Sequence, residues 1–263
     1  MALIAMVSPG NASGVTTTSF ALTLAWPRPV MLAECSPAGG HLLAGYYGGT
    51  ISADRGVWHL ALKTRDGFQA AVADVPNQVV ALDDQKLLMP GLRDPFRSTQ
   101  LTDEMWGHIA EVFQHLPMDV ILDIGHVGAD LPFGLVRAAD VVMMVMRPTL
   151  AQAAAAKPRL EALQEALGDA APVALCVVGE GSYDARDVQR SLGDFFLFTV
   201  RMPEDRRSAR VLSEGMAPQN GFSTKPLMRE AAVIARTTVG TLADGRPLSS
   251  RGPTLGGSLG GVA

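Results

Sequence analysis

The residues of this chain that could do chemistry begin with a glycine-rich turn, SPGNASGVTTTS, after the apolar run Ala2–Val7. A strand, a tight turn and a helix in this order can hold a phosphate, because backbone N–H groups and a helix N-terminus favour an anion. Gly14, Thr16 and Thr17 stand where such a loop carries its last glycine and its Mg²⁺-binding hydroxyl. Val15 stands where the phosphate-binding lysine belongs. The pattern alone fits an empty structural turn at least as well as a nucleotide site.

Apolar runs predict the strands that would position this turn. They cover Ala2–Val7, Val30–Cys35, Val120–Asp123, Val141–Met146, Val173–Val178 and Phe195–Val200, and they are apolar on both faces, as parallel strands covered by helices must be. Helical spacing predicts helices over Thr16–Ala25, Thr102–Leu116, Ala151–Leu167, Asp205–Glu214 and Leu227–Thr241. Pro158 is expected to break or kink the third of these, so that it could begin only there.

The alternation of strands and helices predicts one α/β domain over residues 1–243, doubly wound, with a mostly parallel sheet flanked by helices. An α+β fold is the alternative. Residues 43–85 show no clear pattern beyond a weak helix at Ala53–Lys63. Residues 244–263 are rich in Gly, Ser and Pro and lack apolar periodicity, which predicts a flexible tail.

Composition narrows the class of protein. The net charge of −4 gives no overall attraction to nucleic acid, so binding to DNA is not favoured, although local basic patches leave it open. Cys35 and Cys176 lie in apolar runs and are expected as free thiols in a reducing compartment. No signal pattern and no apolar run of about 18–20 residues is present, so we expect a cytoplasmic protein without direct membrane insertion. The excess of Arg over Lys, together with abundant Ala, indicates a GC-rich bacterial genome, such as an actinobacterial one.

Five segments resemble, in the same order, those of the ParA/MinD family of deviant-Walker P-loop ATPases. They are MALIAMVSPGNASGVTTTSFALTLA, VMLAECSPAGG, DVILDIGH, AADVVMMVMRPTLAQAAAA and VRMPEDRRSARVLSEG. The first is similar to the family's first strand, phosphate loop and helix, the second to its switch segment and the third to its Walker B strand. The resemblance spans Ala2–Arg236 and implies a P-loop NTPase-like fold.

The resemblance also implies site residues. Gly14, Val15, Thr16 and Thr17 fall on the nucleotide-binding loop, with Val15 on the P-loop lysine. The family's second lysine, which reaches across a dimer to the partner's phosphates, falls on Gly10. This phosphate loop therefore lacks both lysines of the family, and its Walker A motif is degenerate.

Other family positions are partly kept. Asp123 matches the Walker B aspartate that holds Mg²⁺ through water together with Thr16. Glu34 stands at the first acidic switch position, and Ser36 stands where the family has the aspartate that orients the attacking water. Pro203 and Asp205 lie in a segment that in the family is near the nucleotide base. Loss of lysines and of the water-orienting carboxylate removes most of what phosphoryl transfer requires.

Two further residues could act at the same edge of the sheet. His126 follows Asp123 where sites of α/β proteins lie, and it either faces the phosphate loop or has no role. Arg147 follows the strand 141–146 and, with Arg206, could replace a missing lysine.

Two functions remain open from the sequence. The first is a noncatalytic or nearly inert ParA/MinD-like scaffold for localisation or assembly, which acts through unknown protein partners. The second is an active ATPase that dimerises on ATP and positions DNA or another cargo. Either is expected to be a homodimer. The cofactor is ATP or ADP with Mg²⁺, or none if the loop is purely structural.

Overall fold

The computed structural model describes residues 1–10, 13–52, 54–168 and 172–244. Among these residues, eight strands form one sheet in the order β3-β4-β2-β5-β1-β6-β7-β8. The strands are β1 (Leu3–Ser8), β2 (Val30–Glu34), β3 (Val80–Ala81), β4 (Lys86–Met89), β5 (Asp119–His126), β6 (Val141–Met146), β7 (Val173–Val178) and β8 (Thr199–Met202). All neighbours pair in parallel except β3, which pairs with β4 in the antiparallel sense. The carboxyl ends of the parallel strands therefore share one edge, the carboxyl edge.

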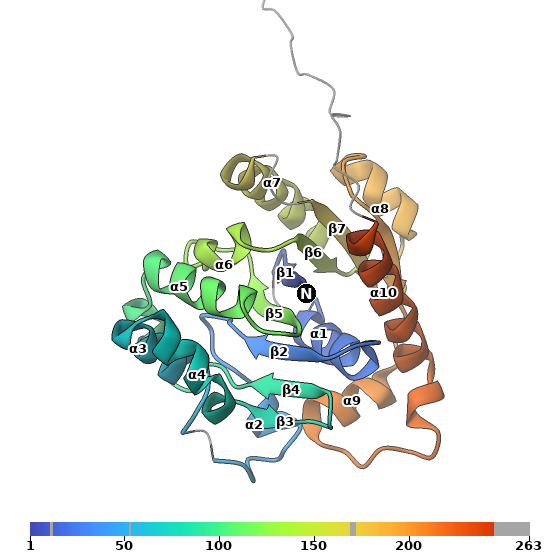
Figure 1. Ribbon diagram of the computed structural model, residues 1–263. Helices are drawn as coiled ribbons and strands as arrows, with labels where there is room; N and C mark the ends of the chain where they lie inside the picture. The colour runs from blue at the N-terminus through green and yellow to red at the C-terminus, as the bar shows by residue number, and fades with distance from the viewer. Residues whose placement is uncertain (11–12, 53, 169–171, 245–263) are drawn as a thin grey trace, which may run out of the picture.

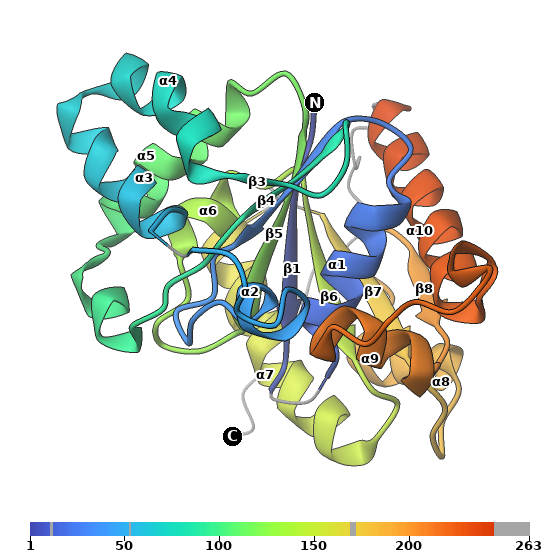
Figure 2. The ribbon, with the colours of Figure 1, turned by 90° about the horizontal axis from the view of Figure 1, so that it is seen from below.

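Helices cover both faces of this sheet (Figures 1 and 2). One face is packed by α3 (Val57–Lys63), α4 (Phe68–Gln78), α5 (Asp103–Gln114), α6 (Phe133–Arg137), α7 (Leu150–Leu167) and α8 (Ala185–Leu192). The other is packed by α1 (Val15–Ala25), α2 (Leu42–Gly45), α9 (Arg206–Glu214) and α10 (Pro226–Ala243). Three short 3₁₀ segments, Thr64–Asp66, Pro95–Gln100 and Phe222–Thr224, connect these elements. The arrangement confirms the predicted doubly wound α/β fold.

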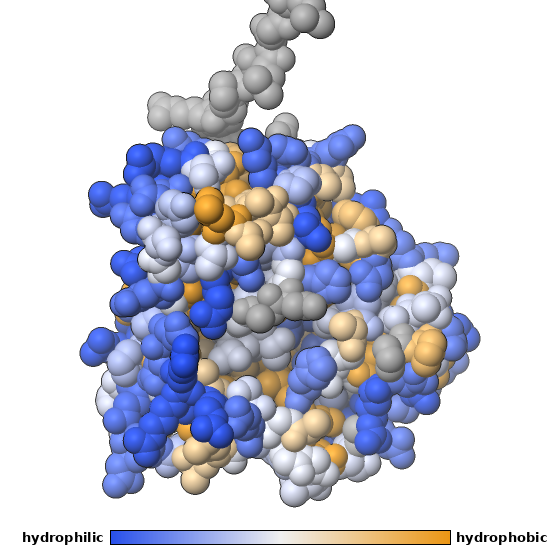
Figure 3. Space-filling view, turned by 180° about the vertical axis from the view of Figure 1, so that it is seen from behind, coloured by the Kyte–Doolittle hydropathy of each residue, from blue (hydrophilic) through white to orange (hydrophobic). Residues whose placement is uncertain are grey.

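The surface mixes small hydrophobic patches with larger hydrophilic areas on the face behind that of Figure 1 (Figure 3). Large exposed apolar side chains among the described residues include Phe96 and Leu150, which are 77% and 69% exposed. None of the described helices combines the length and the apolar character required to cross a bilayer.

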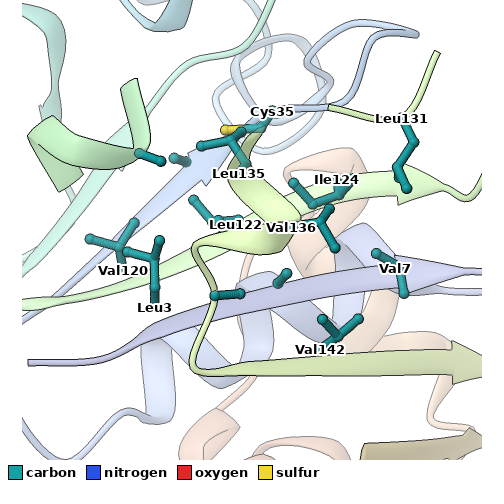
Figure 4. Close-up of a cluster of buried hydrophobic side chains, with 14 of the residues drawn as sticks. Leu3, Val7, Cys35, Val120, Leu122, Ile124, Leu131, Leu135, Val136 and Val142 are labelled. Atoms are coloured by element: carbon teal, nitrogen blue, oxygen red, sulfur yellow. The ribbon is translucent and has the colours of Figure 1, made fainter. Parts of the chain in front are cut away.

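The central strands β1, β5 and β6 form the hydrophobic core with the helices on either side. Their apolar side chains are almost fully buried because both faces of the sheet are covered. Figure 4 shows part of one cluster, in which β1, β5, β6, α6 and the loops after β2 and β5 contribute Leu3, Val7, Cys35, Val120, Leu122, Ile124, Leu131, Leu135, Val136 and Val142. Such a core fixes the strand ends, and therefore the loops at the carboxyl edge, relative to one another.

At the opposite edge of the sheet, the buried carboxylate of Asp119 joins three segments. It accepts hydrogen bonds from Ala2 N (2.7 Å), from Trp26 Nε1 (2.8 Å) and from both Nε and Nη2 of Arg28. The start of β1, the end of α1 and the start of β5 are thereby connected. A buried carboxylate is stable only with such partners.

Two sequence predictions of elements are wrong in detail. Pro158 does not begin or break a helix, because α7 runs through it from Leu150 to Leu167. The ring lies on the exposed side of α7, where water can satisfy the carbonyl of Ala154, which is also exposed. The strand predicted at Phe195–Val200 begins only at Thr199.

Other elements were not predicted. The sequence 43–85, which gave no clear pattern, contains most of α2, all of α4 and the short edge strand β3, and the strand β4 and the helices α6 and α8 were also missed. Of the tail predicted over residues 244–263, the structure describes Asp244 alone, and this residue is the C-cap of α10. The remainder of that tail, residues 245–263, lies outside the described residues.

Candidate functional site

The turn after β1 ends at Gly14, which adopts the left-handed conformation with φ 89° and ψ 17° and precedes α1. Glycine adopts this conformation without strain, whereas other residues do so at a cost. Within the described part of the chain, no side chain caps the first turn of α1, and no acidic residue lies in it. The N–H groups of that turn therefore have no side-chain acceptor, as a phosphate-binding helix start requires.

The turn is tied to the end of β5. Ser8 Oγ donates to the carbonyl oxygens of Gly10 (3.0 Å) and Gly125 (3.2 Å). Ser13 Oγ also donates to Gly10 O (3.2 Å), and Val127 N donates to Ser8 O (2.9 Å). These contacts hold the phosphate-loop-like turn beside the strand that carries Asp123.

Thr16 and Asp123, the two residues that the sequence assigns to an Mg²⁺ site, lie close together. The Thr16 hydroxyl donates a hydrogen bond to the Asp123 carboxylate, and Gly125 N donates to Asp123 Oδ1 at 3.3 Å. Desolvation raises the pKa of Asp123 to about 7, and the charge of Glu34 adds to the rise, whereas the Thr16 and Gly125 hydrogen bonds oppose it. A carboxylate in this condition gains from a nearby cation.

The oxygen donors fit Mg²⁺ only in part. Among the described residues, no group of three or more His, Cys, Asp or Glu side chains could hold a metal ion. Mg²⁺ usually binds through one or two carboxylates together with phosphate oxygens and water. Thr16 and Asp123 can therefore serve Mg²⁺ that arrives with a nucleotide, but not Mg²⁺ alone.

The two positions of the missing lysines have different surroundings. Val15 is half-buried and packs against the apolar cluster formed by β1, α1 and β7. A Cβ built on Gly10 would meet no heavy atom within 4 Å among the residues described. The side chain at position 15 thus packs against apolar residues, whereas position 10 has open space for a longer side chain.

Glu34 is the last residue of β2 and Ser36 lies two residues later, and the two side chains have different surroundings. The Glu34 carboxylate is buried and accepts hydrogen bonds from His41 N (2.7 Å), Leu42 N (3.0 Å) and Gly91 N (3.3 Å). Ser36 Oγ accepts a long hydrogen bond from Ala38 N (3.3 Å). Ser36 carries no charge that could orient a water molecule.

His126 is the last residue of β5 and pairs in register with Ser8, so it lies at the carboxyl edge beside the turn. Its Nε2 atom lies 3.1 Å from the place that a Cβ on Gly128 would take. The ring therefore lies close over the backbone that follows β5. This position agrees with the predicted neighbourhood of the phosphate loop and does not by itself assign a role.

The two arginines that could replace a lysine share one partner. Arg147 Nη1 lies 3.5 Å from Glu204 Oε2, and Arg206 Nε lies 2.9 Å from Glu204 Oε1. The hydrogen bond from Arg206, followed by the charge of Arg147, lowers the pKa of Glu204. Both guanidinium groups are thereby directed to the loop after β8.

Pro203 and Asp205 line a hollow of about 700 Å³ between the loop after β8, α9 and the start of α10. Burial would raise the pKa of Asp205, but hydrogen bonds from Ser208 and Leu227 leave it below its usual value. Ser208 N (3.1 Å) and Ser208 Oγ (2.6 Å) both donate to its carboxylate, which caps α9. The lining also includes Glu180, Glu204, Arg206, Arg207, Ser208, Gln219, Lys225 and Pro226.

This hollow lies near the turn after β1, because Val178 Cγ1 is 3.6 Å from the Cβ position of Gly14 and Gly179 contacts Glu204. Sequence reasoning found Pro203 and Asp205 but missed Glu204 as the shared acid, as well as Gln219 and Lys225. The only signal for the last two is that they precede α10, which no pattern connects with β8.

No protein-family model and no curated protein sequence matches this chain. Solved structures do. A ParA family ATPase from Chlorobium tepidum TLS has a TM-score of 0.73 at 13% identity, with 89% of this chain and 97% of that chain covered. MinD from Pyrococcus horikoshii OT3, complexed with Mg-ADP, has a TM-score of 0.68 at 12% identity and coverages of 91% and 98%.

The cell division ATPase MinD of Pyrococcus furiosus is similar to the same extent, with a TM-score of 0.69, 13% identity and coverages of 91% and 98%. Identities this low establish the fold alone, and the coverage extends over nearly the whole length of each protein. The chain has the fold of the ParA and MinD ATPases.

Proposed function

We propose that this protein is a ParA/MinD-like scaffold for localisation or assembly that hydrolyses ATP very slowly or not at all. The observation that carries the proposal is the absence of charge at the two lysine positions, since Val15 packs against the core and Gly10 has no side chain. Phosphoryl transfer requires positive charge on the transferred group and a positioned water molecule. Ser36 offers no carboxylate for that water.

The arginines at the carboxyl edge do not compensate in this arrangement. Arg147 and Arg206 both contact Glu204, so moving either toward a phosphate would break a charge-assisted contact. What remains for an anion is the start of α1, the Thr16 hydroxyl and Mg²⁺ placed before Asp123. These groups support weak binding of ATP or ADP with Mg²⁺ and not efficient hydrolysis.

The test of catalysis is ATP turnover by the purified protein with Mg²⁺. We expect a rate equal to the buffer background, and the same rate for Asp123→Ala. A measurable rate that Asp123→Ala abolishes would contradict the noncatalytic proposal and favour the alternative, an ATPase that positions DNA or another cargo. The preserved contact between Thr16 and Asp123 is the observation that supports this alternative.

The test of binding is calorimetric titration with Mg-ATP and Mg-ADP. We expect weak binding that Thr16→Ala reduces and that chelation of Mg²⁺ reduces further. Thr237→Ala is the matched control, because Thr237 is equally half-buried and lies on α10, outside the turn after β1. Unchanged affinity in Thr16→Ala would remove the site from this turn.

The nucleoside part of such a ligand is proposed to lie in the hollow beside Pro203 and Asp205. Its polar lining supports this placement, as does the position of Glu180 of the lining, two residues after Val178, which lies beside Gly14. Gln219→Ala is the suitable variant, because Asp205 caps α9 and its loss would disturb the fold. We expect weaker nucleotide binding in Gln219→Ala with an unchanged free energy of unfolding.

Action through other proteins is supported by the surface of α7 and α8. These helices border a groove of about 790 Å³ in which exposed Leu150 and Tyr183 accompany alanines of α7. Exposed apolar side chains gathered in a groove are typical of contact sites. We also propose a homodimer whose formation does not require ATP, which sedimentation of the protein with and without Mg-ATP would test.

A further inference from the structure

Two loops at the carboxyl edge are bound together through one buried side chain. The first loop, residues 36–42, follows β2, and the second, residues 90–92, follows β4. Glu34 Oε1 accepts from His41 N and Leu42 N, and Glu34 Oε2 accepts from Gly91 N. A single carboxylate thus receives backbone N–H groups from both loops.

The backbones of the two loops also touch. Gly40 N donates to Leu92 O at 2.8 Å. A Cβ on Gly40 would lie 2.9 Å from Gly91 Cα, and a Cβ on Gly91 would lie 3.0 Å from Gly40 Cα. Side chains at either position would push the loops apart, so the close approach depends on both glycines.

The Glu34 side chain has no solvent to interact with, since the residue is only 2% exposed. Desolvation raises its pKa, and the three backbone hydrogen bonds oppose this effect. Backbone N–H groups that converge on a carboxylate have the arrangement that such groups adopt around a bound anion. In this chain an internal side chain takes the place that a ligand's oxygens would otherwise occupy.

We infer that Glu34 is a positioning residue that locks residues 36–42 to residues 90–92, so that this part of the carboxyl edge keeps one conformation with and without nucleotide. In nucleotide switches, a loop becomes ordered when its groups contact the terminal phosphate and Mg²⁺. Here the N–H groups of His41, Leu42 and Gly91 already have an acceptor. A ligand that offers them no better acceptor cannot shift the loop.

Hydrogen exchange of backbone amides tests the lock in the free protein. Glu34→Asp is the main variant, because it keeps the charge but is one methylene too short to reach both loops. We expect exchange at His41, Leu42 and Gly91 to rise by about tenfold or more, as loss of hydrogen bonds to a charged acceptor predicts. Exchange of the core amides in β1 and β6 should rise by a smaller factor.

Glu34→Gln is the second variant, which keeps the length and one acceptor oxygen and protects the test against a misfolded Asp variant. It should give an intermediate rise in the same amides. Glu165→Asp, a change of the same kind at an exposed position of α7, is the control and should leave all these rates unchanged. Equal increases across loops and core would show that Glu34 acts on global stability alone and would overturn the inference.

A second measurement adds Mg-ATP at a concentration that saturates any calorimetrically detected site. We expect the exchange rates of residues 36–42 and 90–92 to change by less than about twofold, since their acceptor is already present. Strong protection or release of these amides by Mg-ATP would overturn the inference even if nucleotide binding is real. If no nucleotide binds, the free-protein comparison of the Glu34 variants still decides it.

Discussion

Two aspartates of β5, four residues apart, are buried to nearly the same extent but have very different surroundings. Asp119, at the start of the strand, is 1% exposed and receives hydrogen bonds from a backbone N–H, an indole and a guanidinium. Asp123, near the carboxyl edge, is 2% exposed, and among the described residues its carboxylate receives only the Thr16 hydroxyl and the Gly125 N–H. Asp119 is paired with the Arg28 guanidinium, whereas Asp123 has no ion pair within the part of the chain that the structure describes.

The difference separates a structural carboxylate from a candidate binding carboxylate. Burial alone does not indicate function, because a buried charge that is fully partnered can simply hold segments together. A buried carboxylate without a cation is held in an unfavourable charged state, which any arriving cation would relieve. In this chain the second condition occurs at the carboxyl edge, beside the turn after β1.

The largest expected effect comes from Asp119→Ala. It would leave the Arg28 guanidinium, the Trp26 indole and Ala2 N without their acceptor, and should lower the free energy of unfolding by about 5 kcal/mol. Urea denaturation followed by fluorescence, in which Trp26 itself contributes, measures this. Asp119→Asn, which keeps one acceptor oxygen, should lower the free energy of unfolding by less than Asp119→Ala does. A loss below about 1 kcal/mol, the size typical of a surface ion pair, would show that Asp119 contributes no more to stability than an exposed residue does.

Asp123→Asn should raise the free energy of unfolding at pH 8, whereas Asp119→Ala lowers it. The folded pKa of Asp123, about 7, lies above its reference value of 3.8, so the folded state binds the proton first. Stability is therefore gained as pH falls from above 7 toward 4, and the charged form at pH 8 destabilises the fold by up to ~4 kcal/mol. Asn removes this charge while keeping an acceptor for Thr16.

We thus expect Asp123→Asn to be more stable than the parent chain at pH 8 and about equally stable at pH 4. Denaturant midpoints measured from pH 4 to pH 8 provide the check. If the variant loses stability at pH 8, then Asp123 is held by partners as Asp119 is, and the contrast between the two residues disappears.

Much of the fold was accessible from the sequence because buried parallel strands are apolar on both faces. The runs at Val30–Cys35 and Val141–Met146 needed no further information to be identified as strands. The strand β4 was missed because it has only three apolar residues in a row after Lys86, too few to predict a strand. The helix α7 shows the reverse case, in which an exposed Pro158 is tolerated because the lost hydrogen bond faces water.

The site was predictable where neighbouring residues in sequence form it, as in Gly14 and Thr16, or where strand order brings ends together, as in Asp123. The site was not predictable where a side chain has several possible hydrogen-bond or ion-pair partners in the fold. Nothing in the sequence indicates that Glu204 binds both Arg147 and Arg206, or that Glu34 points back toward the N–H groups of residues 41, 42 and 91.

Val15→Lys adds a cation near Asp123, at the carboxyl end of β5, as Arg28 is the cation beside Asp119. An ammonium group beside the turn should strengthen Mg-ATP binding by about tenfold, the effect of one charge-assisted hydrogen bond. Val15→Met, which has similar length and no charge, is the control and should leave the calorimetric affinity unchanged. Because Val15 also packs against the core, Gly10→Lys offers a second position, where a new side chain meets open space.

Equal gains in the Lys and Met variants would show that packing, and not charge, limits binding at this turn. A gain for Mg-ADP equal to that for Mg-ATP would show that the new cation acts on the phosphates common to both. Either result would weaken the conclusion that missing lysines explain the slow turnover proposed above.

The smallest expected effect comes from Thr16→Val, which removes one of the two donors to Asp123. Loss of this donor should raise the pKa of Asp123 further and lower the free energy of unfolding by about 1 kcal/mol at pH 8. At pH 4, where Asp123 is protonated in the folded state, the difference should vanish. Thr17→Val is the control for the loss of a half-buried hydroxyl in the same turn of α1. An equal loss of stability in Thr16→Val at pH 4 and pH 8 would show that the hydroxyl stabilises the helix start and not the Asp123 carboxylate. Asp123 would then have one partner fewer than the structure indicates, and its contrast with Asp119 would be larger.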